Sequence, residues 1–251
     1  MKGTVGELRQ ALLFLTVLPL SAQAGSTRQL GRSMAYFPLI GLGLGLLLAG
    51  ANYALGIFFP PSVSALLVLL LLIYCTGALH LDGVADTADG MYGIRDRATR
   101  LRIMKDSRVG AMGVVALLCL LLLKVVTLTA IPPAVRWPVL IALPVVGRWM
   151  KVALAVLAPY ARSEGGTGSV FVEEVGRREL FLATLLLAAV LVGFFQLWGL
   201  TLLAALILVV IALERYFKVR LGGVTGDILG AVCEWSEAFF LLLASAAYFH
   251  R

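Results

Sequence analysis

The feature that most limits how this chain can fold is a long stretch without formal charge. No residue between Arg32 and Asp82 is an aspartate, glutamate, lysine or arginine. Such a stretch is too long and too apolar for one helix of a soluble core, and it can hold two bilayer crossings of about 20 residues each. The composition agrees, since only 14% of the 251 residues are charged, against about 25% in soluble domains. We therefore expect a single all-α membrane domain covering 1–251.

Apolar runs and their charged interruptions predict about seven membrane-spanning helices. Pro60-Pro61 separates the first span from the second, and Pro132-Pro133 separates the third from the fourth. A tight turn near Trp198-Gly199 predicts that the fifth and sixth spans form an antiparallel hairpin. The predicted spans are 35–59, 62–80, 111–131, 137–159, 180–198, 200–216 and 229–249.

The segment before the first span predicts an N-terminal amphipathic or half-inserted helix. Polar and apolar residues alternate there with helical spacing, which is typical of a helix lying in the membrane interface. Membrane lipid is therefore an expected partner of the chain. The residues expected to face lipid are Leu8, Leu12, Leu13 and Leu15.

The positions of the basic residues predict the orientation. With the N-terminus in the cytoplasm, 16 of the 21 Lys and Arg residues fall on the cytoplasmic side and two on the other. This asymmetry is typical of multi-pass proteins of the cell inner membrane. It also explains the net charge of +7 without a nucleic-acid partner. Three polar stretches, 80–110, 160–178 and 214–227, would then share the cytoplasmic face.

The first polar stretch carries three aspartates with helical spacing. Asp82, Asp86 and Asp89 stand at i, i+4 and i+7, so a helix places them on one face. Like charges at this spacing destabilise a helix, and a hard cation such as Mg²⁺, with substrate phosphates, would offset the repulsion. The alternative is a solvated helix end paired with nearby arginines. His80 lies on the opposite side, where a lone histidine is more often an interface residue than a ligand.

Basic residues follow this acidic helix. Lys105 and Arg108 bracket Asp106 and suit either the phosphate oxygens of a substrate or anionic lipid headgroups, and both readings stay open. Arg148 and Lys151 lie inside the fourth span, where buried charges need partners. We expect one of them to pair with Glu234 or Glu237.

Two glycine-rich stretches on the same face could cradle an anion. One surrounds Arg162, and the other contains Gly222 and Gly223 and leads into the last span. Thr225 is a plausible cap for that helix, and no basic residue closely follows Asp227. We therefore expect Asp227 to act with the first acidic face and not as a cap.

These motifs together resemble the cobalamin synthase family, the adenosylcobinamide-GDP ribazoletransferases of bacterial and archaeal vitamin B12 assembly. The resemblance extends over nearly the whole chain. The residues that carry it are Phe14-Leu-Thr-Val-Leu-Pro19, Phe37-Pro-Leu-Ile-Gly41, Leu79-His-Leu-Asp-Gly-Val-Ala-Asp-Thr-Ala-Asp-Gly90, Ile103-Met-Lys-Asp-Ser-Arg-Val-Gly110, Gly147-Arg148 and Gly222-Gly-Val-Thr-Gly-Asp-Ile-Leu-Gly-Ala231.

The resemblance implies a Mg²⁺-dependent transferase. Its substrates would be adenosylcobinamide-GDP and α-ribazole or α-ribazole 5′-phosphate, and GMP would be released. The alternatives are a CDP-alcohol-type phosphotransferase, whose acidic motif is spaced differently, and a secondary transporter, whose site would lie nearer the bilayer midplane. The expected catalytic residues are Asp82, Asp86, Asp89 and Asp227, with the first three as metal ligands; the expected substrate-binding residues are His80, Lys105, Asp106, Arg108, Arg148, Arg162, Gly222, Gly223 and Thr225.

Overall fold

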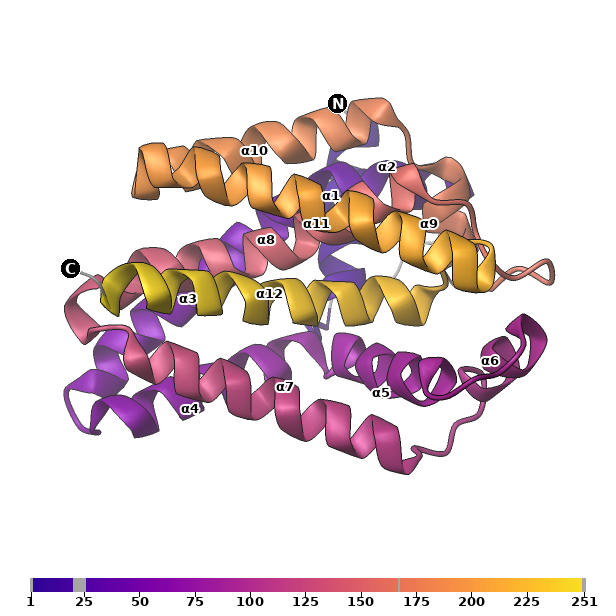
Figure 1. The fold of residues 1–251 in the computed structure, drawn as a ribbon. Coiled ribbons are helices and arrows are strands. Elements are labelled where there is room, and N and C mark those ends of the chain that lie inside the picture. Colours follow the sequence, from indigo (N-terminus) through magenta and orange to yellow (C-terminus); the bar gives the residue numbers. More distant parts are fainter. Residues whose placement is uncertain (1, 20–25, 167, 250–251) are drawn as a thin grey trace.

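A computed structural model describes residues 2–19, 26–166 and 168–249. Among these residues the regular structure is entirely helical, and the helices lie side by side in one bundle (Figure 1). The all-α prediction is confirmed. The helices are α1 (Lys2–Leu15), α2 (Thr27–Ser33), α3 (Phe37–Gly56), α4 (Pro61–Thr76), α5 (Leu79–Met91), α6 (Arg97–Ile103), α7 (Ala111–Ala130), α8 (Arg136–Leu157), α9 (Ser169–Glu174), α10 (Arg177–Phe195), α11 (Leu197–Leu221) and α12 (Gly226–Phe249), with 3₁₀ turns at Met34–Tyr36 and Pro133–Val135.

The membrane-spanning helices agree with the sequence pattern except at two joints. Within the described residues, six helices are long and apolar enough to cross a bilayer, and a seventh crossing is possible if α4 and α5 count together. These two helices meet at an angle of 91°, because Gly77 and Ala78 both adopt left-handed backbone angles. The turn between α10 and α11 falls at Gln196, two residues before Trp198, and the two helices pack together as the predicted hairpin. Helix α11 runs on to Leu221, beyond the predicted end of its span.

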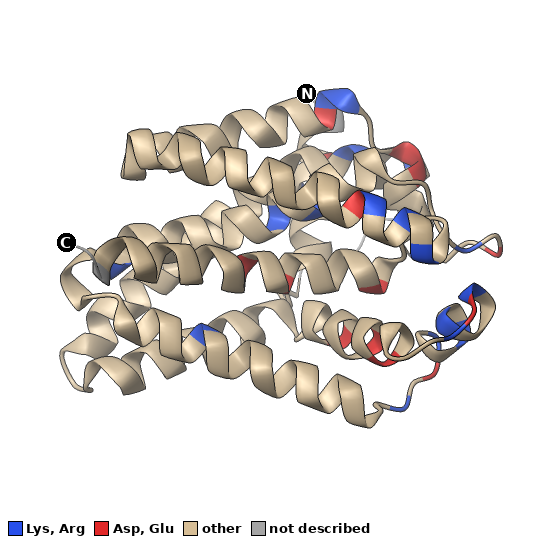
Figure 2. Cartoon of the chain, in the orientation of Figure 1, with Lys and Arg blue, Asp and Glu red and all other residues tan. Residues whose placement is uncertain are grey.

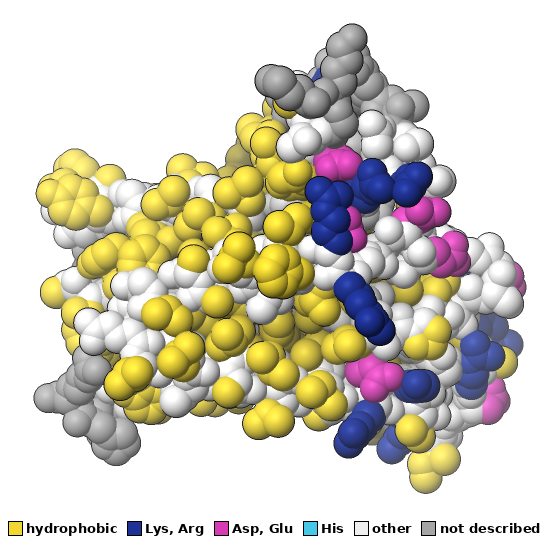
Figure 3. Space-filling model, turned by 90° about the horizontal axis from the view of Figure 1, so that it is seen from above, with side chains coloured by type: hydrophobic (Ala, Val, Ile, Leu, Met, Phe, Trp, Pro, Cys, Tyr) yellow, Lys and Arg dark blue, Asp and Glu magenta, His cyan; other side chains and the backbone are white. Residues whose placement is uncertain are grey.

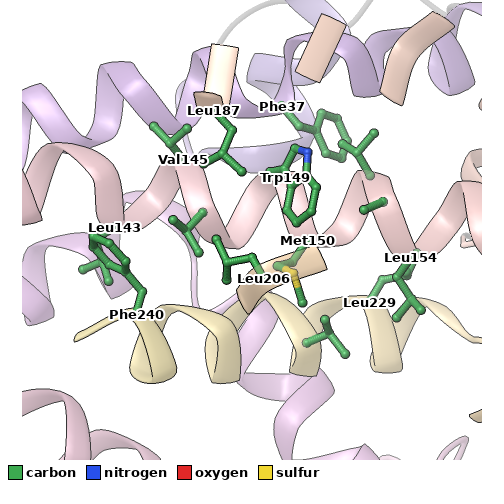
Figure 4. Packing of buried hydrophobic residues seen from close by; sticks show 14 of the residues in the cluster. Phe37, Leu143, Val145, Trp149, Met150, Leu154, Leu187, Leu206, Leu229 and Phe240 are labelled. Carbon is green, nitrogen blue, oxygen red and sulfur yellow. The ribbon is translucent and has the colours of Figure 1, made fainter. Parts of the chain in front are cut away.

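The centre of the bundle is α8. Its side chains are buried without interruption from Pro138 to Ala155, and α3, α10 and α12 pack around it. Figure 4 shows Trp149 and Met150 of α8 among side chains from neighbouring helices, including Phe37. On α3, a Cβ atom at Gly45 would lie 2.3 Å from the Ile141 carbonyl oxygen. Small residues therefore let these two helices approach each other closely.

The N-terminal helix α1 packs against the bundle. Ala11 and Leu15 are fully buried in the core, and the Phe14 ring stacks on Phe37. The expectation that Leu15 faces lipid is therefore wrong, because α1 turns that side chain inward. Val5 and Leu8 remain exposed.

The surface divides into an apolar part and a charged end. Hydrophobic side chains cover most of the visible length of the bundle, and the basic and acidic side chains gather at one end (Figure 3). This is the end that carries α6 and α9, and α5 leads toward it (Figures 1 and 2). The polar stretches that the sequence places on one side of the membrane therefore lie together.

Candidate active site

The three aspartates of α5 lie on one helix, as their spacing predicts. Between and behind these aspartates, the helix carries small and apolar residues, including Gly83, Val84 and Ala85, which are buried against neighbouring helices. Asp82 is exposed, and Asp86 and Asp89 are partly buried. The aspartates of α5 are therefore at least partly accessible, whereas the small residues between them are buried.

The carboxylate of Asp89 is fixed by the N-terminus of α7. Its Oδ2 accepts a hydrogen bond from the Gly110 amide at 2.7 Å, and its Oδ1 accepts one from the Gly113 amide at 2.9 Å. The first amides of a helix attract negative charge. Each oxygen keeps a further lone pair, so these bonds orient the carboxylate and leave it able to accept another ligand.

A second chain segment brings Asp227 to the same place. Helix α12 approaches α5 so closely that a Cβ atom at Gly83 would lie 2.4 Å from the Asp227 carbonyl oxygen. The charge of Asp227 is near enough to interact with both Asp82 and Asp86. Asp227 Oδ2 accepts a hydrogen bond from Arg162 Nη2 at 2.8 Å. The sequence did not predict this pairing, because Arg162 lies 65 residues before Asp227.

Thr225 caps α12, which leaves the Asp227 side chain for another role. The Thr225 hydroxyl oxygen accepts a hydrogen bond from the Ile228 amide at 3.3 Å and donates one to Asp227 Oδ2 at 3.2 Å. The expectation that Thr225 provides the cap is confirmed. The helix start therefore does not depend on the Asp227 carboxylate.

The carboxylate oxygens of these aspartates are ligands that suit a metal ion, but the side chains are not arranged around a single point. Within the described residues, no three His, Cys, Asp or Glu side chains converge closely enough to hold an ion. Three acidic neighbours and one cation, Arg162, act on Asp86. This excess of carboxylate oxygens fits Mg²⁺, which usually takes one or two carboxylates and completes its shell with water and substrate phosphates.

A cavity of about 180 Å³ opens beside these acids. Asp82 and Asp227 line it from α5 and α12, and we call it the acidic pocket. Its other walls include His80, Lys151 and Phe14. Helices α1, α3, α5, α8 and α12 therefore all contribute to one cavity.

Lys151 lines the acidic pocket, whereas the sequence singled it out only as a buried cation that needs a partner. Its Nζ lies 2.9 Å from His80 Nε2 and 5.1 and 5.4 Å from the ring centres of Phe14 and Phe37. Aromatic faces attract an ammonium group, so the two rings hold Lys151 at the pocket wall. A lysine inside an apolar span was the available signal, but the expected partner was a glutamate and not His80.

The glycine-rich loops pair with each other. The Val224 amide donates to the Pro159 carbonyl at 2.9 Å, and the Ala161 amide donates to Val224 at 2.8 Å. Gly223 makes this possible, because a Cβ atom there would lie 2.1 Å from the Pro159 oxygen. The Gly222 amide caps α11 through the Lys218 carbonyl. These glycines therefore fix the loop that carries Arg162, and the Gly222 amide is already engaged.

The remaining predicted cations have separate surroundings. Lys105 Nζ lies 3.1 Å from Glu164 Oε2. Arg108 Nη2 lies 2.7 Å from Asp106 Oδ2, and the hydrogen bonds from Arg108 lower the pKa of the exposed Asp106 carboxyl to about 2. Both pairs are at the charged end, where a phosphate could reach them.

Arg148 lies in the interior and does not line the acidic pocket. It pairs with Glu237, as expected for one of the buried cations, and is fully buried. Lys124 joins the same group, with its Nζ 2.5 Å from Glu234 Oε2 and 2.7 Å from Glu237 Oε2. We call Lys124, Arg148, Glu234 and Glu237 the interior ion cluster. Two cations and two anions offset one another there.

Comparison with known proteins decides the family. The sequence profile described as cobalamin-5-phosphate synthase matches residues 7–245. The chain belongs to this family. A curated relative from Desulforamulus reducens is 40% identical over 94% of this chain and 94% of its own length. Another, from Geotalea daltonii, is 41% identical over 92% of this chain and 94% of its own length. Both are named adenosylcobinamide-GDP ribazoletransferase. No solved structure matches the chain.

Membership of the cobalamin-5-phosphate synthase family confirms the resemblance read from the motifs. The chain is an enzyme of cobalamin synthesis. The phosphotransferase and transporter alternatives are not favoured. Most acidic residues lie toward one end of the bundle (Figure 2), whereas a transporter would hold its site near the midplane.

Proposed function

We propose that this chain joins α-ribazole, or its 5′-phosphate, to adenosylcobinamide-GDP and releases GMP. The 5′-hydroxyl oxygen of α-ribazole attacks the phosphorus that is linked to cobinamide. The bond between that phosphorus and the bridging oxygen breaks, the electron pair leaves with GMP, and the hydroxyl proton is released to solvent. The product is adenosylcobalamin or its 5′-phosphate. The family match over almost the whole chain supports this reaction, as do the names of the relatives.

The observation that carries the assignment of the site is the meeting of α5 and α12. Their contact brings Asp227 beside Asp82 and Asp86, and Asp82 and Asp227 line one cavity. Reactions of this kind are accelerated mainly by positioning and by neutralising phosphate charge. We assign Asp82, Asp86 and Asp89 to hold Mg²⁺ together with the substrate phosphates. The ion would neutralise charge on the diphosphate.

The protein's own side chains would orient the two reactants. Arg162 is held by Asp227 at the edge of the acidic pocket, where its guanidinium suits a phosphate oxygen. His80 and Lys151 also line the acidic pocket. Lys105 and Arg108 are exposed at the same end of the molecule and would attract the anionic substrate. Arg148, buried and paired with Glu237, is assigned to the framework instead.

The decisive experiment follows GMP release by purified protein in detergent. We expect GMP and a cobalamin product in equal amounts only when adenosylcobinamide-GDP, α-ribazole and Mg²⁺ are all present. Removing the metal with EDTA should stop the reaction, and adding Mg²⁺ should restore it. GMP release without α-ribazole would indicate a hydrolase and contradict the proposal. Full activity in EDTA would contradict only the metal assignment.

We also propose that the charged end faces the cytoplasm and that the protein lies in the inner membrane. The support is the clustering of Lys and Arg at that end (Figure 2). Single cysteines at Ser163 and at Ala134, in a background where the native cysteines are replaced, would test this with an impermeant maleimide. We expect labelling of the Ser163 position only after the cytoplasmic side is opened. The reverse pattern would overturn the orientation.

A further inference from the structure

A second polar cavity lies beside the acidic pocket, at the charged end. It has a volume of about 460 Å³ and lies between α6 and the loop that follows α8. Its polar lining includes Arg97, Arg102, Lys105, Arg162 and Glu164, and we call it the basic pocket. A volume of this size is within the usual range for pockets that bind small molecules.

The wall of the basic pocket is built into the fold. Arg97, the first residue of α6, donates hydrogen bonds of 2.6 Å to the Leu221 carbonyl through Nε and to the Ala161 carbonyl through Nη2. These bonds tie α6 to the end of α11 and to the 158–166 loop. The pocket therefore has a fixed shape, and the Nε and Nη2 donors of Arg97 are used to hold it.

Other cations in the pocket keep donors for a ligand. Arg102 forms no ion pair with any described residue and is exposed. Arg162 binds Asp227 through Nη2, while its buried Nε has no partner in the described part of the chain. A buried donor without a partner is costly. A negatively charged ligand in this pocket would satisfy it.

Arg162 connects the two pockets. It lines the basic pocket, and it binds Asp227, which lines the acidic pocket. A diphosphate lying across Arg162 would place one phosphorus near the carboxylates and the other over the basic pocket. This arrangement rests on the proposed function, because adenosylcobinamide-GDP has such a diphosphate between its two halves.

We propose that the basic pocket binds the guanosine monophosphate half of the substrate, which is the leaving group. Arg102 and Lys105 suit the phosphate and the O6 and N7 acceptors of guanine. Glu164 can accept hydrogen bonds from the guanine N1–H and 2-amino groups, and its side chain is 79% exposed. Adenine has no matching donors at these positions. The pocket thus selects a guanine nucleotide and sets the direction in which the diphosphate lies.

GMP binding by equilibrium dialysis tests this without turnover. We expect labelled GMP to bind the purified protein and AMP to compete at least about ten times less well. Arg102→Gln should weaken GMP binding about ten-fold, the order expected when one charged hydrogen bond is lost. Glu164→Gln should reduce the preference for GMP over AMP. The matched control is Arg178→Gln, an exposed arginine at the start of α10, which should bind GMP as the parent does.

The outcomes separate this proposal from the proposed function. Unchanged GMP binding in both pocket variants would overturn the site. A parent protein that makes cobalamin but neither binds GMP nor distinguishes it from AMP would overturn the nucleotide pocket and leave the reaction standing. Guanine-selective binding that depends on Arg102 and Glu164, in a protein that never releases GMP from adenosylcobinamide-GDP, would support the pocket and refute the reaction.

Discussion

The molecule holds two groups of charged residues that differ in how their charges are matched. In the interior ion cluster, Lys124 and Arg148 face Glu234 and Glu237, and all four side chains are buried. The second group is Asp82, Asp86, Asp89 and Asp227, in which three carboxylates and a single cation, Arg162, act on Asp86. The first group is balanced by the protein alone. The second has an excess of negative charge that the protein does not offset.

This difference separates a structural role from a functional one. Charges inside an apolar bundle must be neutralised by partners on neighbouring helices, since transfer from water is costly. The interior ion cluster meets this need by joining α7, α8 and α12. The second group lies toward the charged end, where water, Mg²⁺ and phosphate can reach it. Its unbalanced carboxylates are therefore suited to a ligand that brings positive charge.

Breaking the interior ion cluster should have the largest effect, and it should act on stability. Glu237→Leu leaves Arg148 without a carboxylate and Lys124 with only Glu234. We expect a loss of about 3–5 kcal/mol in the free energy of unfolding, as for other buried pairs that lose one partner. Thermal unfolding in detergent and the yield of folded protein would measure it.

The double variant Glu237→Leu/Arg148→Met provides the control for this prediction. It removes the stranded cation together with its partner, so it should recover a substantial part of the lost stability. A single Glu237→Leu variant that unfolds at the parent's temperature would show that the interior ion cluster does not stabilise the bundle.

Neutralising the acids of α5 should instead act on turnover. We expect Asp82→Asn, Asp86→Asn and Asp89→Asn each to slow GMP release by at least about 100-fold, the order seen when electrostatic stabilisation of a transition state is lost. Asp82→Asn and Asp86→Asn should unfold at the parent's temperature. Asp89→Asn should also be less stable, because an amide cannot accept both hydrogen bonds from Gly110 and Gly113. Near-normal activity in any two variants would contradict the metal assignment.

Asp227→Ser should give the smallest of these effects. Thr225 keeps the helix cap, so the variant should be as heat-stable as the parent. Arg162 loses its partner, and we expect turnover to fall about ten-fold with a shifted Mg²⁺ titration, since one charge-assisted hydrogen bond is removed. An active Asp227→Ser protein with an unchanged Mg²⁺ titration would remove this residue from the site.

The sequence predicted the parts of this structure that depend on local pattern. Uninterrupted apolar length located the spans, and a spacing of four and three residues placed Asp82, Asp86 and Asp89 on one helix. The bend at Gly77 and Ala78 had no such signal. The apolar run continues through it, and an alanine seldom adopts the positive φ that Ala78 has here.

Contacts between distant segments were predictable only where a buried charge required an oppositely charged partner. A buried arginine needs a carboxylate, so the pairing of Arg148 with Glu237 followed from their depth in the spans. The contacts of Lys151 with His80 and of Arg162 with Asp227 join residues 71 and 65 positions apart. One contact joins α8 to α5 and the other joins the loop after α8 to α12, and no single segment reveals such pairings.

The bend after α4 has a consequence for the lipid around the protein. Helix α4 has 16 residues and, at about 1.5 Å per residue, reaches about 24 Å, which is less than the roughly 30 Å of a bilayer's hydrocarbon layer. Helix α4 therefore does not complete a crossing alone, and a seventh crossing needs α5 as well. The bend at Gly77 and Ala78 would then lie inside the hydrocarbon layer, and α5 would begin below the headgroups. Lipid chain length thus becomes a variable that sets how deep the first turn of α5, and Asp82 with it, lies beneath the headgroups.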